Sequence, residues 1–136
     1  MAKHQLFPFF TPRDHWKKKV YISGPMTGLP EHNTPAFRGA AEKLRSLEYS
    51  VCNPAETDDI LGPLTHEQYL RFDFERVLEA DFLIALPGWE NSLGATSEIL
   101  VAIRVGTPVW GWENWTDYDR ITYERAVAAM AAKAGV

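Results

Sequence analysis

Short apolar runs along the chain alternate with longer segments in which apolar residues recur every three or four positions. Runs rich in β-branched and aromatic residues predict four strands, at about residues 19–23, 49–52, 80–86 and 107–112. The third run is the most continuously apolar, which is typical of a central parallel strand that is covered on both faces.

Helix signals occupy the segments between these strands. Thr34 precedes Pro35, and Thr65 lies three residues before Gln68 in the spacing of a capping box, so both threonines predict helix starts. Gly106 is in the usual position for ending the third helix. The helices are expected at 34–47, at about 65–79, at 93–105, and from Thr116 or Thr122 through the alanine-rich end.

Strands that alternate with helices predict a parallel sheet with right-handed crossovers. We therefore expect an α/β fold, a small doubly wound open sheet of the flavodoxin-like or Rossmann-like kind, with four or five strands and helices on both faces. This domain is expected over residues 19–136, after an N-terminal extension over residues 1–18. Ligands of such sheets bind beyond the carboxyl ends of the strands, where the strand order reverses.

Composition narrows the classes of partner. A length of 136 residues is typical of one domain, and 14 Lys and Arg against 18 Asp and Glu argue against a nucleic-acid partner. No apolar run approaches the roughly 20 residues of a membrane span, so no membrane partner is expected. The single cysteine, Cys52, and the lack of a signal peptide favour the cytoplasm.

Cofactor motifs are missing from the sequence. Neither G-x-x-x-x-G-K-[ST] nor G-x-G-x-x-G occurs, so we expect no nucleotide cofactor. The four histidines are scattered, and we expect no metal site. The predicted strand-end loops are rich in Gly, Asn and Trp, which suits close approach of a ligand but also ordinary turns and packing. These loops are residues 24–30, 53–56, 88–92 and 111–114.

Glu98 is the most informative carboxylate. It lies in the second turn of the third helix and shares its face with Gly94, Ala95, Val101 and Ala102. A carboxylate on a small apolar stripe is costly to bury without a partner, and its small neighbours leave room for a ligand. The alternative is that its side chain turns to the sheet edge near the helix N-terminus, where the dipole favours an anion.

Two aspartates are further candidates. Asp73 lies one helical turn after Tyr69, and its alternative role is an ion pair with an arginine such as Arg76. Asp81 comes directly before the third strand, where an aspartate is more often a turn or capping residue than a chemical one.

Three segments together resemble the nucleoside 2-deoxyribosyltransferase superfamily: YISGPMTG at 21–28, the pair Asp73 and Asp81, and SLGATSE at 92–98. The resemblance spans about Val20 to Val109. It is closest to a short, often phage-associated and mostly uncharacterised branch with the same Y-I-S-G-P-M-T-G opening and L-P-G-W loop. It implies cleavage or transfer at the bond between the base and C1′ of a 2′-deoxynucleoside or its 5′-monophosphate.

The resemblance also implies roles for individual residues. Glu98 matches the nucleophile, Tyr21 would help to hold it, and Asp73 would bind or protonate the substrate, whereas Asp81 matches a more structural aspartate. We expect substrate-binding residues in the loops and at the start of the third helix. They are Ser23, Gly24, Pro25, Met26, Thr27, Gly28, Asp81, Gly88, Trp89, Ser92 and Gly94.

The sequence departs from this family's pattern at three positions. Ser92 stands where transferases have Asp, as it does in a related branch that hydrolyses deoxynucleoside 5′-monophosphates and uses the Ser for phosphate. That branch carries Ser and Arg where this chain has Pro25 and Thr27, so a cation is missing from the expected phosphate pocket. Loop N–H groups, Thr27 and Ser92 remain as donors for an anion.

Two other functions stay open from the sequence. The altered loop favours a binding or sensing module that holds a nucleotide without turning it over. Trp110, Trp112 and Trp115 suggest a partner-binding surface. We also expect a homodimer or higher homo-oligomer, because these tryptophans would otherwise be exposed, and because the resemblance implies sites completed across a dimer interface.

Overall fold

The computed structural model describes residues 16–113 and 119–133. Its sheet has four strands in the order β2-β1-β3-β4, all parallel, which confirms the expected α/β class. The strand order reverses between β1 and β3, so the predicted ligand edge lies at the carboxyl ends of these two strands. The strands are β1 Lys19–Ser23, β2 Ser50–Cys52, β3 Phe82–Ala85 and β4 Val109–Gly111.

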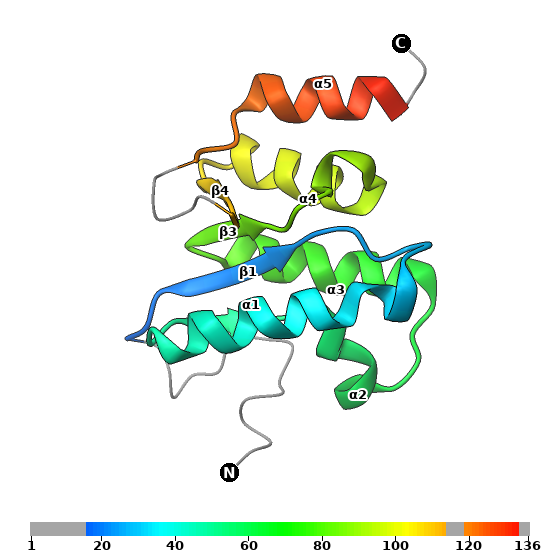
Figure 1. The fold of residues 1–136 in the computed structure, drawn as a ribbon, viewed down its shortest axis with the longest axis vertical. Helices are drawn as coiled ribbons and strands as arrows, with labels where there is room; N and C mark the ends of the chain where they lie inside the picture. Colours follow the sequence, from blue (N-terminus) through cyan, green and yellow to red (C-terminus); the bar gives the residue numbers. More distant parts are fainter. Residues whose placement is uncertain (1–15, 114–118, 134–136) are drawn as a thin grey trace.

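Helices cover the two faces of the sheet unequally (Figure 1). One face packs against α1, where Phe37 and Leu44 meet Val20 and Ile22 of β1. The other face packs against α3 and α4, and α5 packs against α4 and η5. The helices are α1 Thr34–Ser46, α2 Thr57–Leu61, α3 His66–Glu79, α4 Leu93–Arg104 and α5 Tyr123–Lys133, with 3₁₀ turns η3 Pro30–Asn33, η4 Pro54–Glu56 and η5 Trp89–Asn91.

Most helix boundaries follow from their capping residues. The predicted capping box is confirmed: Thr65 Oγ1 accepts from the Gln68 N–H at 3.2 Å, and Gln68 Oε1 accepts from the Thr65 N–H at 2.8 Å. Gly106 follows α4 with a φ of 86°, as expected for a residue that ends a helix. The prediction that Thr34 caps α1 is wrong, because Thr34 is already helical and Asn33 occupies the capping position.

Residues 54–61 form η4 and α2, in a polar segment for which the sequence predicts neither a strand nor a helix. Asn53 begins this segment, since its side-chain oxygen accepts from the Ala55 N–H at 3.0 Å and Pro54 suits a first helical position. Local capping therefore outweighs the polar composition of the segment.

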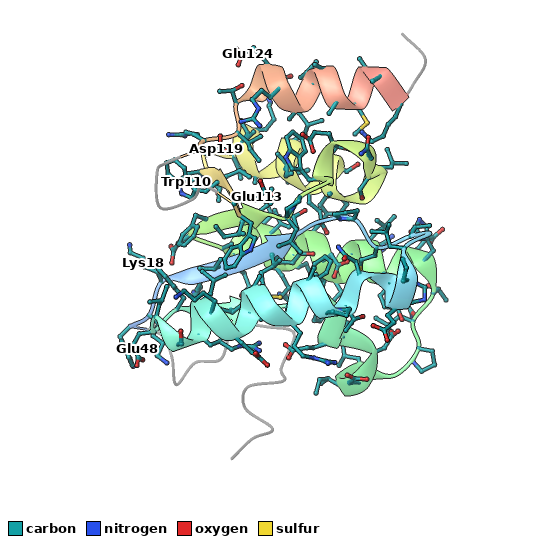
Figure 2. The ribbon with its side chains drawn as sticks, in the orientation of Figure 1. Lys18, Glu48, Trp110, Glu113, Asp119 and Glu124 are labelled. Atoms are coloured by element: carbon teal, nitrogen blue, oxygen red, sulfur yellow. The ribbon has the colours of Figure 1, made fainter. Side chains whose placement is uncertain are left out.

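After β4 the chain turns back along the same strand. Trp110 forms an antiparallel bridge with Arg120, and the Gly111 N–H donates to the Asp119 carbonyl at 2.8 Å, so Trp110 and Asp119 lie close together (Figure 2). This return places the start of α5 at Tyr123, next to the expected Thr122; the other expected start, Thr116, lies outside the described residues.

The tryptophans near β4 are less exposed than the sequence suggests. Trp110 and Trp112 are half-buried and pack against the core on the α1 face of the sheet. Trp115 lies outside the described residues.

Within residues 16–113 and 119–133, no helix has the length and apolar character needed to cross a membrane.

Candidate functional site

A carboxylate and two hydroxyls meet at the carboxyl end of β1. Tyr21 and Ser23 are two residues apart on this strand, so both side chains lie on the face covered by α4. Tyr21 Oη donates to Glu98 Oε2 at 2.7 Å, and Ser23 Oγ donates to Glu98 Oε1 at 2.7 Å. Each carboxylate oxygen of Glu98 thus accepts a hydrogen bond from β1.

The sequence around Glu98 explains why α4 approaches the sheet so closely. Ser92 caps the helix, its Oγ accepting from the Ala95 N–H at 3.1 Å, and Glu98 follows in the second turn. Ala95 and Ala102, on the same helical face, are buried against the sheet. Because these side chains are small, the Glu98 carboxylate reaches β1 rather than turning to the sheet edge.

Asp73 supplies a second carboxyl group near the first. Its negative charge raises the pKa of Glu98, Tyr21 and Cys52, and its helix, α3, packs against both β1 and α4. Among the described residues, no hydrogen bond to the half-buried Asp73 side chain is formed. The alternative role, an ion pair with Arg76, is not formed, because Arg76 binds Glu79 at 2.6 Å and Glu75 at 3.1 Å.

Both carboxyl groups hold protons more tightly than usual. Burial raises the pKa of Asp73 to about 7, against the positive charge of Arg76. Burial, reinforced by the charge of Asp73, raises the pKa of Glu98 to about 8, although the hydrogen bonds from Ser23 and Tyr21 favour its ionised form. At neutral pH the two groups therefore retain a proton between them, which is the condition for one acid and one base in the same site.

The first and third loops form a contiguous rim beside this cluster. A Cβ on Gly24 would lie 2.8 Å from Leu86 Cβ, so the first loop approaches Leu86, the residue after β3, more closely than any residue other than glycine allows. Gly88 has a φ of 87°, and a Cβ there would lie 3.3 Å from Pro25 Cγ. The Leu29 N–H donates to the Met26 carbonyl at 3.2 Å, which closes a turn over residues 26–29.

The remaining expected site residues lie in different surroundings. Thr27, Gly28 and Gly94 are exposed at the carboxyl edge of the sheet. Trp89, by contrast, is only 4% exposed and belongs to the core, with the Arg125 guanidinium 5.8 Å from the centre of its ring. Ser92 combines the two properties, since it is half-buried at the edge and its hydroxyl caps α4.

Asp81 lies apart from the other expected site residues. It precedes β3, at the end of the strand opposite to Ser23 and Glu98, and it is exposed. Its carboxylate accepts a hydrogen bond from the Lys19 N–H at 2.8 Å, and so joins the starts of β1 and β3.

Sequence reasoning missed three features of this region. Ser23 was expected to bind substrate, but the structure makes it a donor to Glu98, a role that its position two residues after Tyr21 could have indicated. Asn33 binds the Pro25 carbonyl at 2.9 Å. The buried Thr57 hydroxyl, at the start of α2, has no hydrogen-bond partner among the described residues, and no sequence signal marks it.

In the described part of the chain, no three or more His, Cys, Asp or Glu residues are grouped so that they could hold a metal ion.

No curated protein and no solved structure matches the sequence. One family does match, over residues 18–111, which include β1, the whole of α3 and α4, and β4. The chain therefore belongs to the family described as "Domain of unknown function (DUF4406)".

Proposed function

We propose that the protein cleaves the N-glycosidic bond of a 2′-deoxynucleoside or of its 5′-monophosphate, with Glu98 as the nucleophile. The observation that carries the proposal is the Glu98 carboxylate, held by two hydroxyls of β1 with the Asp73 carboxyl beside it. Retaining glycosidases use two carboxyl groups in this way, one as nucleophile and one as acid. The likeness of three segments to nucleoside 2-deoxyribosyltransferases supports the same assignment.

In the first step, ionised Glu98 bonds to C1′ while the bond from C1′ to the base nitrogen breaks. The electron pair of that bond goes to the base, and protonated Asp73 donates a proton to the leaving base. In the second step, water or a second base attacks C1′ and releases the Glu98 carboxylate. Ionised Asp73 accepts the proton that the attacking molecule loses, so the enzyme returns to its starting state.

In the free protein the pKa of Glu98, about 8, exceeds that of Asp73, about 7, so the state with Glu98 ionised and Asp73 protonated is the minor one, and the reaction proceeds through it. Tyr21 and Ser23 donate to the carboxylate of Glu98, so they stabilise the ionised form that attacks and the carboxylate that is released. Asp73 has a pKa of about 7, which is suited to a group that gives and takes a proton near neutral pH.

A panel of substrates tests the proposal. The full chain is incubated with 2′-deoxynucleosides and their 5′-monophosphates, with and without a free acceptor base, and base release is followed by chromatography. We expect turnover by the wild type and a loss of at least about 10³-fold in Glu98→Gln. The matched control is Glu90→Gln, at an exposed position on the same edge, which should keep full activity.

Two results would contradict the proposal in different ways. Equal turnover by Glu98→Gln would remove this residue as nucleophile. No turnover by the wild type with any substrate, together with a rise in melting temperature on adding one of them, would favour the binding or sensing module. The absence of Lys and Arg from the first loop, residues 24–30, is the observation on which that second candidate depends.

We also propose that a second copy of the chain packs against α3. Leu70, Phe74 and Leu78 form an apolar stripe on this helix, and Leu70 and Leu78 are 37% and 55% exposed. In an antiparallel pair of these helices centred on Phe74, helical geometry sets Leu70 opposite Leu78 of the second copy. It also sets the exposed Arg71 beside Glu75 of the second copy. The same surface of α3 thus offers its copy both apolar contacts and opposite charges.

A further inference from the structure

A left-handed turn lies directly before α1. Glu31, His32 and Asn33 have φ values of 54°, 53° and 61°, and none of them is a glycine. This conformation is unfavourable for L-amino acids, although Asn tolerates it better than most. Three such residues in succession persist only when surrounding contacts hold them there.

The Asn33 side chain supplies such a contact. Asn is a favoured capping residue because its side chain accepts a hydrogen bond from the first turn of a helix. Asn33 occupies the capping position of α1, but its side chain forms no capping bond. Its amide Nδ2 instead donates to the Pro25 carbonyl at 2.9 Å, eight residues earlier in the chain.

Pro25 is the point at which the first loop leaves the Glu98 cluster. It lies two residues after Ser23, and its ring lies against Gly88 of the third loop. Gly24 is held closely against Leu86 on the other side. The Asn33 amide therefore holds the Pro25 carbonyl. This carbonyl belongs to the peptide bond that leads into the turn at residues 26–29.

We infer that Asn33 is a positioning residue that holds the turn at residues 26–29 in place before a ligand arrives. The inference rests on the proposed function and further places the substrate between this turn and Glu98. A loop that is already ordered does not have to be ordered on binding, so its rigidity strengthens binding without changing the chemical step. The effect of Asn33 is therefore expected in KM and not in kcat.

Three variants separate the hydrogen bond from the backbone strain. Asn33→Gly removes the amide and suits the left-handed backbone, so it keeps the fold. Asn33→Asp keeps the size of the side chain but replaces the donor by an acceptor. The matched control is Glu31→Gly, which relieves the same kind of strain and leaves the Asn33 amide in place.

Hydrogen exchange of the amides at residues 26–29 is measured first, without substrate. We expect faster exchange in Asn33→Gly and Asn33→Asp than in the wild type, and wild-type exchange in Glu31→Gly. Unchanged exchange in Asn33→Gly would overturn the inference, whatever reaction the enzyme catalyses. This measurement needs no turnover, so its failure is distinct from a failure of the proposed function.

Steady-state kinetics with the best deoxynucleoside of the panel then test the consequence for binding. We expect KM to rise about five- to tenfold in both Asn33 variants, with kcat within about twofold of the wild type. Glu31→Gly should keep the wild-type KM. A fall in kcat at unchanged KM, or an equal rise of KM in Glu31→Gly, would assign Asn33 a structural role and overturn the inference.

Discussion

Glu98 illustrates how its surroundings change an ordinary acidic residue. Loss of solvation raises its pKa, the charge of Asp73 adds to this effect, and the hydroxyls of Tyr21 and Ser23 oppose it. The balance lies at a pKa of about 8, so burial outweighs two short hydrogen bonds. Because the two donors belong to β1 and the carboxylate to α4, this balance exists only in the folded chain.

The raised pKa of Glu98 predicts how stability depends on pH. Its folded pKa of about 8 lies above the ordinary value of 4.5, so the folded chain binds this proton more tightly than the unfolded chain. The resulting stabilisation is complete below about pH 4.5 and is lost as the pH rises to about 8. We therefore expect Glu98→Gln to gain stability relative to the wild type across this window, on the order of 1 kcal/mol or more.

Urea unfolding of both proteins at pH 5, 7 and 9 measures this difference. Glu90→Gln, at an exposed position, should show the same difference from the wild type at each pH. A pH-independent difference for Glu98→Gln would mean that Glu98 is not protonated more readily in the folded chain.

The α4 helix joins the fold to the site through its first two turns. The Ser92 hydroxyl accepts a hydrogen bond from the Ala95 N–H, and the Ser92 carbonyl accepts one from the Thr96 N–H at 2.9 Å. Ser92 therefore caps α4 with its side chain and accepts the first backbone bond of the helix. Glu98 follows in the next turn. The start of α4 therefore sets the position of the Glu98 carboxylate relative to β1.

Loss of this cap should destabilise the protein by a predictable amount. We expect Ser92→Ala to lower the free energy of unfolding by about 1 kcal/mol, and Ser92→Gly to lower it by only a few tenths, because Gly is tolerated at the capping position. Urea midpoints of the two variants at constant m-value provide the measurement. Equal stability of Ser92→Ala and the wild type would show that the hydroxyl does not support the helix.

The helices and strands were largely predictable, apart from the start of α1 and the segment η4–α2. β1, α3 and α4 follow from apolar periodicity and capping residues that lie within a few positions of each other. The start of α1 was misplaced because the Asn33 side chain is directed to Pro25, a contact between a helix start and a loop. Local patterns do not contain such contacts, and so they cannot predict them.

The arrangement of the elements leaves an apolar stripe of α3 incompletely covered. In α3, Val77 is buried against the core, whereas Leu70 and Leu78 remain exposed on a neighbouring stripe. The expected surface at the tryptophans is a weaker candidate for an interface, because Trp110 and Trp112 already pack against the core. The α3 stripe is therefore where we expect the second copy to bind.

Sedimentation velocity tests this interface. We expect the wild type to be a dimer at micromolar concentration and the double variant Leu70→Lys, Leu78→Lys to be a monomer, because two charges would face each other in an apolar contact. Leu47→Lys is the matched control, since Leu47 is 45% exposed at the end of α1, and it should remain a dimer. A monomeric wild type would contradict the prediction.

A charge reversal sharpens the assignment of the partner surface. Arg71→Glu should weaken the dimer by placing like charges together, and the double variant Arg71→Glu, Glu75→Arg should restore it, because opposite charges again face each other. Failure of this restoration would place the interface elsewhere.

The sequence by itself determined the parallel α/β class and the main elements, and it marked Glu98 as an unusual carboxylate, because periodicity, capping residues and a carboxylate on an apolar helix face are local properties of the chain. Only the tertiary structure decided that Tyr21 and Ser23 share that carboxylate, that Asp73 is not paired with Arg76, and that Asp81 lies at the opposite end of its strand. The contacts of Glu98 and Asp81 join residues that are far apart in the chain. They depend on the sheet order and on how closely α4 approaches β1, and neither is encoded in any single segment.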